Sequence, residues 1–204
     1  MLEPNRSMVA CDQLPPRFPT QAHAPAFWEA LGRAVATFGF LEDTLGSAIF
    51  AYTGMRQIPE EQINAAYEKW TLTLQRALSG TLYPLIDTYH KAVIDQTGAT
   101  IENFDVLIDQ LREAARLRNV LCHGSWNKKP DAEGRSIPFF VTGLGEKQRI
   151  FDTPIDIAYL QHVQRGVAEL ACKVINTVTH MGWRFPGSSG PGLPLWPSRD
   201  SPAD

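Results

Sequence analysis

The stretch IENFDVLIDQLREAARLRNVLCHG, residues 101–124, decides the fold of this chain. Its apolar residues recur at intervals of three and four, which is the spacing of an amphipathic helix. The helix is expected to run from the first residue of the stretch to about Cys122, since Gly124 is typical of a helix end. Arg118 falls on the apolar stripe, where an unpaired cation is costly. His123 stands at the helix end. These two exceptions suggest a small polar site.

Three other segments carry the same helical periodicity. The expected helices cover residues 25–52, 59–79 and 154–181, and residues 81–97 form either a separate helix or a bent continuation of the second. Between residues 136 and 152, two short β-prone runs flank a glycine-containing turn, which predicts a β-hairpin. The expected fold class is therefore all-α: an antiparallel four- or five-helix bundle with a small β-hairpin inserted before the last helix.

The chain of 204 residues suits one domain with tails, and its 44% hydrophobic content supports a full core. Residues 1–24 are rich in proline and polar residues, which predicts an extended N-terminal arm. The helical domain is expected to cover residues 25–183. Residues 184–204 are rich in Gly, Pro and Ser and are expected to be disordered.

The composition limits the classes of function. A net charge of −3 gives no global basic field of the kind that most duplex-DNA binders use. The basic residues gather locally, because five lie between Leu111 and Lys129 against one acid. The three cysteines are far apart and show neither metal-ligand nor disulfide spacing, which favours a reducing, cytoplasmic setting. We expect no signal peptide, no membrane span and no metal or cofactor.

Arg118 is followed directly by Asn119, and four residues separate it from His123. This arrangement resembles the defining motif of the HEPN superfamily of helical-bundle proteins. The stretch FGFLED, residues 38–43, is also similar to the first helix of that group. The resemblance covers about residues 26–181. It implies a metal-independent endoribonuclease that acts as a homodimer, often a toxin or an anti-phage effector.

The resemblance also implies roles for single residues. Arg118 would hold the scissile phosphate and its developing charge, because a guanidinium forks two hydrogen bonds to phosphate. His123 would act as general acid or base on the ribose 2′-OH or the leaving oxygen, since imidazole transfers protons near neutrality. Asn119 would help to position one of them. Many family members carry an aromatic residue two positions after the His, where this chain has Ser125, with Trp126 one position later.

The helix geometry sets a condition on this mechanism. Five residues on an ideal helix correspond to a rotation of roughly 140°. The side chains of Arg118 and His123 therefore do not stack within one helix. They could converge if the helix unwinds at Gly124, or if a second protomer completes the site.

Several residues keep a structural interpretation beside the functional one. Glu42 lies on the apolar stripe of the first helix, so it is the expected ion-pair partner of Arg118, either as a structural device or to fix the guanidinium near the phosphate. Arg118 and His123 could instead be a core arginine and a helix-capping histidine. Lys128 and Lys129 belong either to a solvated loop or, beside His123, to an RNA-facing lip in which Trp126 is the stacking aromatic residue.

Our leading hypothesis from the sequence is a cytoplasmic, homodimeric ribonuclease that cuts RNA with Arg118 and His123. A second hypothesis is a non-catalytic helical module for binding or regulation, in which Arg118 is structural. A third is a regulatory component of a toxin or phage-defence pair, with an antitoxin or regulatory protein as partner.

Overall fold

A computed structural model of the chain describes residues 10–54, 60–62, 64–65, 67–68, 70–72, 75, 81–96, 101–143 and 148–188. The described chain is mostly helical and carries a two-stranded antiparallel hairpin before the last helix, as the sequence predicts. About half of the helix expected at residues 59–79 lies outside the described residues. Most of the expected C-terminal tail, from residue 189 onward, lies outside them as well.

The elements begin and end close to the expected positions. The helices are α1 (Pro25–Gly54), α3 (Leu82–Ile94), α4 (Phe104–His123) and α5 (Ile157–His180), the 3-10 turns are η1 (Cys11–Gln13) and η2 (Glu60–Gln62), and the strands are β1 (Val141–Thr142) and β2 (Arg149–Ile150). The last helix starts three residues later than expected. Asp156 caps it by accepting a hydrogen bond from the backbone N–H of Tyr159 at 2.7 Å, which satisfies one of the donors at the helix start.

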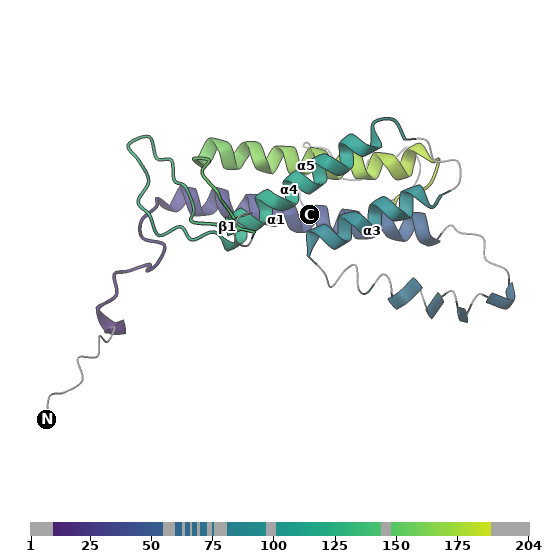
Figure 1. Cartoon of the computed structure of the whole chain (residues 1–204), viewed down its shortest axis with the longest axis horizontal. Helices are drawn as coiled ribbons and strands as arrows, with labels where there is room; N and C mark the ends of the chain where they lie inside the picture. The colour runs from purple at the N-terminus through teal and green to yellow at the C-terminus, as the bar shows by residue number, and fades with distance from the viewer. Residues whose placement is uncertain are drawn as a thin grey trace, which may run out of the picture.

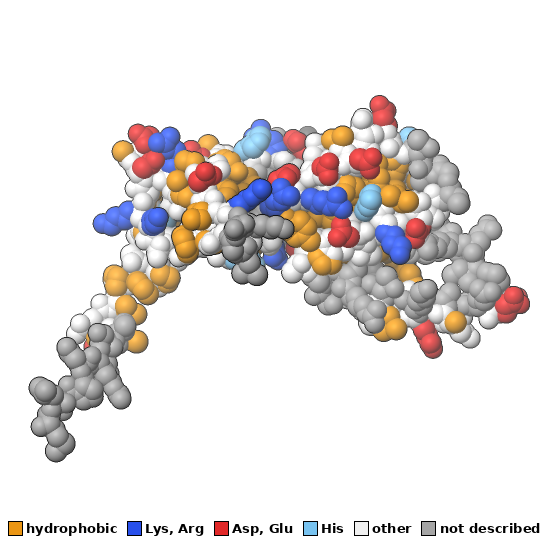
Figure 2. Space-filling model, viewed as in Figure 1, with side chains coloured by type: hydrophobic (Ala, Val, Ile, Leu, Met, Phe, Trp, Pro, Cys, Tyr) orange, Lys and Arg blue, Asp and Glu red, His pale blue; other side chains and the backbone are white. Residues whose placement is uncertain are grey.

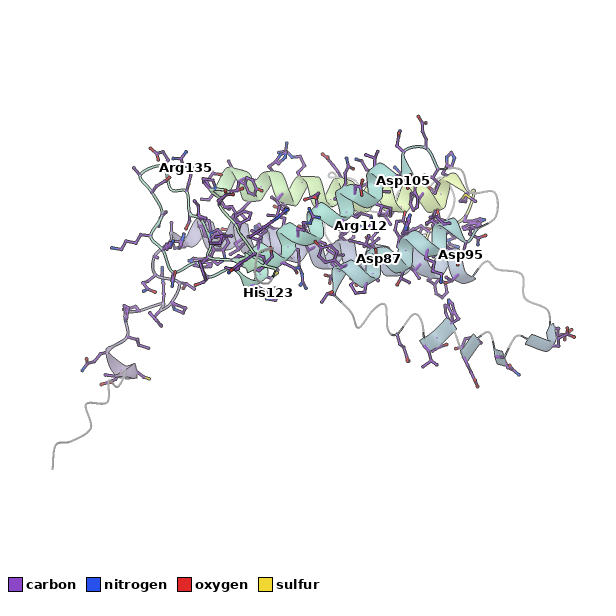
Figure 3. The ribbon with its side chains drawn as sticks, viewed as in Figure 1. Asp87, Asp95, Asp105, Arg112, His123 and Arg135 are labelled. Atoms are coloured by element: carbon purple, nitrogen blue, oxygen red, sulfur yellow. The ribbon has the colours of Figure 1, made fainter. Side chains whose placement is uncertain are left out.

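The long helices lie side by side, and α1 contacts each of the others (Figure 1). The C-terminal ends of α1, α3 and α5 meet at one end of the molecule. There Gln96, just after α3, donates to the backbone oxygen of Tyr52, and the Tyr52 ring contacts Trp183, just after α5. Helix α4 runs in the opposite direction, so that His123 lies toward the other end (Figure 3). The RNVLCHG stretch therefore leads directly into the hairpin region.

The core is a single apolar cluster drawn from all four helices. Its largest fully buried side chains include Tyr52, Tyr89, Phe38, Leu41 and Leu111. Burial of these side chains supplies the main stabilisation of the fold.

The hairpin region returns to the end of α4. The strands pair Val141 with Ile150 and Thr142 with Arg149. Two isolated bridges extend this pairing: Ser125 pairs with Phe139, and Ser136 pairs with Ile155. The segment that follows His123 is thus hydrogen-bonded to the hairpin.

Helix α1 has the length and apolar composition that a membrane-crossing helix also has, whereas the sequence led us to expect no such stretch. Half of its most apolar window is buried inside the folded chain, as in the core helix of a soluble protein. The helix does not by itself establish a membrane.

Candidate functional site

Arg118 and Glu42 lie opposite each other on α4 and α1. Arg118 Nη2 is 3.6 Å from Glu42 Oε1, and the two side chains are 24% and 33% exposed. Arg118 Nη1 also donates to Oδ1 of the neighbouring Asn119 at 3.4 Å. The structure therefore confirms the ion pair expected between the polar exceptions on the two apolar stripes. Three of the candidate residues come together in this way.

His123 is the last residue of α4, and its side chain is exposed. The chain leaves the helix at Gly124, whose N–H donates to the carbonyl of Val120 at 2.8 Å. A histidine in the last helical turn is well placed to interact with the helix dipole when it is charged. No hydrogen bond or ion pair joins His123 to Arg118 among the residues that the structure describes. One chain therefore presents the two groups separately, as the helical rotation requires.

Cys122 is exposed, although its place on the apolar stripe of the expected helix, next to Leu121, favours a small buried residue. The buried positions of the last turns are Val120 and Leu121. The buried face of α4 in its last turn therefore includes Val120 and Leu121 but not Cys122. Exposure of the thiol leaves His123 with a polar, accessible neighbour.

The side chain of Trp126 is buried, with 9% of its surface exposed. Its ring lies 5.2 Å from that of Phe27 and 6.2 Å from that of His23, measured between centroids. A ring enclosed in this way offers no face to a base, so the expected role of Trp126 as a stacking residue for RNA is wrong. The error arises because its environment is formed by residues about one hundred positions earlier, which local sequence does not reveal.

His23 is a buried histidine that the sequence pattern missed, because it lies in the segment expected to be an extended arm. Its ring stacks on Phe27 at 4.6 Å and meets the edge of Trp28. Neither ring nitrogen has a hydrogen-bond partner among the described residues. Burial lowers the pKa of His23, because the charged imidazolium loses its hydration there. The arm is further tied down by Trp28 Nε1, which donates to the carbonyl of Thr20 at 2.8 Å.

Basic side chains follow the face of α4 in a row, with acidic side chains beside them (Figure 2). Arg112 pairs with Asp87 of α3 at 3.1 Å, and Arg116 pairs with Glu113. These carboxylates offset much of the positive charge that the sequence shows in this stretch. Lys128 and Lys129 are exposed in the loop after α4 and have no ion pair within the described part of the chain. They remain the candidates for contact with a polyanion.

Two grooves lie between α4 and α5, with volumes of about 560 and 470 Å³. A hydrogen bond from Lys173 Nζ to Gln110 Oε1, 2.9 Å long, spans the boundary between them. Their linings include neither Arg118 nor His123. Among the described residues, no three His, Cys, Asp or Glu side chains are grouped closely enough to hold a metal ion.

The structure therefore has a partly buried cluster of Arg118 and Asn119 on α4 with Glu42 on α1. The same helix α4 ends with the exposed His123. A guanidinium such as that of Arg118 can bind a phosphate, and an imidazole such as that of His123 can transfer protons, once both groups reach the same substrate. Comparison of the chain with protein-family models, with curated proteins and with solved structures found no match in any of the three.

Proposed function

We propose that this protein is a metal-independent endoribonuclease of the HEPN type, built as an antiparallel helical bundle, cytoplasmic and homodimeric. The observation that carries the proposal is the position of the RNVLCHG stretch. Arg118 faces Glu42 across two helices, and His123 is exposed as the last residue of α4. The same stretch carries the resemblance to HEPN ribonucleases.

In the proposed reaction, RNA supplies its own nucleophile. His123 as a base takes the proton of a ribose 2′-OH, the 2′-oxygen bonds to phosphorus, and the bond from phosphorus to the 5′-oxygen breaks. The leaving oxygen gains a proton, from a histidine acting as an acid or from water, and the products are a 2′,3′-cyclic phosphate and a 5′-hydroxyl. This route needs no metal, because imidazole moves the proton and guanidinium offsets the charge on the phosphate.

Arg118 suits the phosphate-binding role because its charge is permanent and its donors are fixed in a fork. In the structure, Glu42 and Asn119 contact Nη2 and Nη1 at 3.6 and 3.4 Å. Both contacts are long and leave room for stronger hydrogen bonds to a phosphate. Glu42 would then orient the guanidinium, and Lys128 and Lys129 would attract the RNA backbone.

A second protomer is part of the proposal. Arg118 and His123 point away from each other by a rotation of roughly 140° on an ideal helix. Two copies with their α4 ends facing each other would bring the Arg of one protomer toward the His of the other. Exposure of His123 at the helix end is compatible with such an approach.

The test is incubation of the purified protein with mixed RNA, with and without a chelator. The proposal predicts cleavage in both conditions and products with cyclic phosphate ends. Cleavage that stops in the chelator contradicts the metal-independent mechanism. Equal cleavage by wild type and by His123→Ala contradicts the catalytic assignment.

The alternative is a non-catalytic helical module that binds or regulates a partner, such as an antitoxin. The observation that favours it is that Arg118 already has an ion-pair partner, as Arg112 and Arg116 do. In that case the wild type cuts no RNA, Arg118→Ala lowers the unfolding temperature, and His123→Ala leaves the stability unchanged.

A further inference from the structure

The three residues that follow His123 are each held by a different contact. A Cβ atom on Gly124 would lie 2.5 Å from the carbonyl oxygen of Val120 and 2.8 Å from Cβ of Pro138, so the hairpin approaches the backbone closely there. Ser125 exchanges two backbone hydrogen bonds with Phe139, both 2.9 Å long. The side chain of Trp126 is buried. The exit from α4 is therefore fixed at consecutive positions.

Trp126 connects this exit to the start of α1. Its ring lies against Phe27 in the first turns of α1 and against His23 just before that helix. Phe27 and Trp28 also contact His23, which makes an aromatic cluster of four side chains. Aromatic rings in stacked and edge-to-face contact stabilise each other beyond the area they bury, so the cluster ties the exit from α4 to the start of α1.

The side chain of His123, in contrast, makes no hydrogen bond or ion pair among the described residues, and it is exposed. Its position therefore depends on the backbone that carries it. Helix ends fray unless tertiary contacts hold them. The first buried side chain after His123 in the chain is that of Trp126.

We infer that Trp126 is a positioning residue for His123. Its burial between His23 and Phe27 holds the Gly124–Ser125 segment against the hairpin, and this fixes the last turn of α4. The catalytic meaning of this role rests on the proposed function, whereas the mechanical role does not. The inference also gives the N-terminal arm a purpose, since His23 forms one wall of the anchor.

The experiment is amide hydrogen exchange of the full chain, followed residue by residue from Val120 to Ser125. In Trp126→Leu, exchange at Gly124 and Ser125 is expected to become faster by about tenfold or more, because the bonds to Val120 and Phe139 open more often. Trp126→Phe keeps an aromatic ring and is expected to restore most of the protection. Unchanged exchange in Trp126→Leu overturns the inference.

Trp183→Leu is the matched control. Trp183 contacts Tyr52 at the far end of α1, 25 residues or roughly 37 Å of helix from Phe27. This variant also loses an aromatic contact, but exchange near His123 should remain as in the wild type. Equal acceleration in both tryptophan variants means a general loss of stability and also overturns the inference.

If Trp126→Leu does not fold, His23→Ala opens the same cluster from the arm side. It should accelerate exchange at the same two amides, and the absence of any acceleration again contradicts the positioning role. RNA cleavage provides the second readout: Trp126→Leu should lower kcat by about tenfold with little change in KM. If the wild type cuts no RNA, the proposed function fails, but the exchange result still decides whether Trp126 positions His123.

Discussion

The carboxylate of Glu42 on α1 lies 3.6 Å from the guanidinium of Arg118 on α4. Both side chains interrupt apolar stripes, and each supplies the charge that the other needs. The pair thus allows a permanent cation to stand at a helix–helix contact, five residues before an exposed histidine. This combination of a held cation and an accessible imidazole is the basis of the proposed ribonuclease site.

Replacing either member of this pair should reduce stability modestly. Because the side chains are a quarter and a third exposed, water screens their attraction, and a double-mutant cycle of Glu42→Gln and Arg118→Gln should give a coupling free energy of about 0.5–1 kcal/mol. Urea unfolding of the four proteins measures it. The Glu29–Arg33 pair on α1, which is 65% exposed on both sides, is the control and should show a smaller coupling. A coupling indistinguishable from zero for the Glu42–Arg118 pair would show that the contact does not stabilise the fold.

Gly124 should not tolerate a side chain. In Gly124→Ala the new Cβ meets a backbone carbonyl and the Pro138 ring, so the free energy of unfolding should fall by about 1–3 kcal/mol. Gly39→Ala is the matched control, since Gly39 lies inside α1 and a Cβ there meets nothing within 4 Å. Alanine is the better helix former and should stabilise by up to about 1 kcal/mol there. Thermal unfolding compares the two. A neutral Gly124→Ala would mean that the hairpin can move away from the end of α4.

Much of the fold follows from local sequence patterns. The helical periodicity and the glycine at the helix end predicted α1, α4 and α5 to within a few residues, because these signals act within one or two turns. The Glu42–Arg118 pair could also be predicted, since a charge on an apolar stripe requires a partner.

The surroundings of Trp126 and His23 could not be predicted in the same way. Trp126 stands two residues after a glycine in a polar stretch, and His23 stands in a proline-rich arm, so neither has a periodic neighbour that indicates burial. Their contact depends on how the arm, α1 and the end of α4 meet in space. The exposure of Cys122 could not be predicted for the same reason. Which residues of the last helical turn are buried depends on how that turn packs against the rest of the chain.

The buried imidazole of His23 should make stability depend on pH. Burial lowers the pKa of His23 in the folded state, so below its ordinary value of about 6.5 the unfolded chain binds more protons than the folded one. The stability that the neutral, buried imidazole of His23 contributes is therefore fully present above pH 6.5. It declines as the pH falls toward the lowered pKa of the folded state, and it stays constant below that pKa. Urea unfolding at a series of pH values between 5 and 7.5 measures the slope, which for one group is at most about 1.4 kcal/mol per pH unit.

His23→Phe provides the control for this pH dependence. Phenylalanine can keep the stack on Phe27 and cannot take up a proton. The variant should lose the part of the slope between pH 5 and 6.5 that His23 contributes. If the wild type and the variant show the same slope, the pH dependence comes from other groups.

A buried hydroxyl pair should stabilise the opposite end of the molecule. Thr177 donates to the carbonyl of Val174 at 2.7 Å, so its oxygen accepts from the hydroxyl of Tyr89 at 2.8 Å. Thr177→Val leaves the buried Tyr89 hydroxyl without this acceptor and should cost about 1–3 kcal/mol. Tyr89→Phe removes the donor and leaves the Thr177 bond to Val174, so it should cost less. Chemical unfolding of both variants measures the two costs, and a larger loss in Tyr89→Phe would contradict this assignment of donor and acceptor.

The most direct test of the proposed function compares two exposed histidines in an RNA cleavage assay that contains a chelator. His123 ends α4, and His162 lies on α5, so alanine at either position removes an exposed imidazole from a helix. If His123 transfers the proton, His123→Ala should lower kcat by about 10²- to 10⁴-fold, while His162→Ala keeps the wild-type rate. Equal rates for the wild type and His123→Ala, with all three proteins folded, would contradict the proposed ribonuclease mechanism.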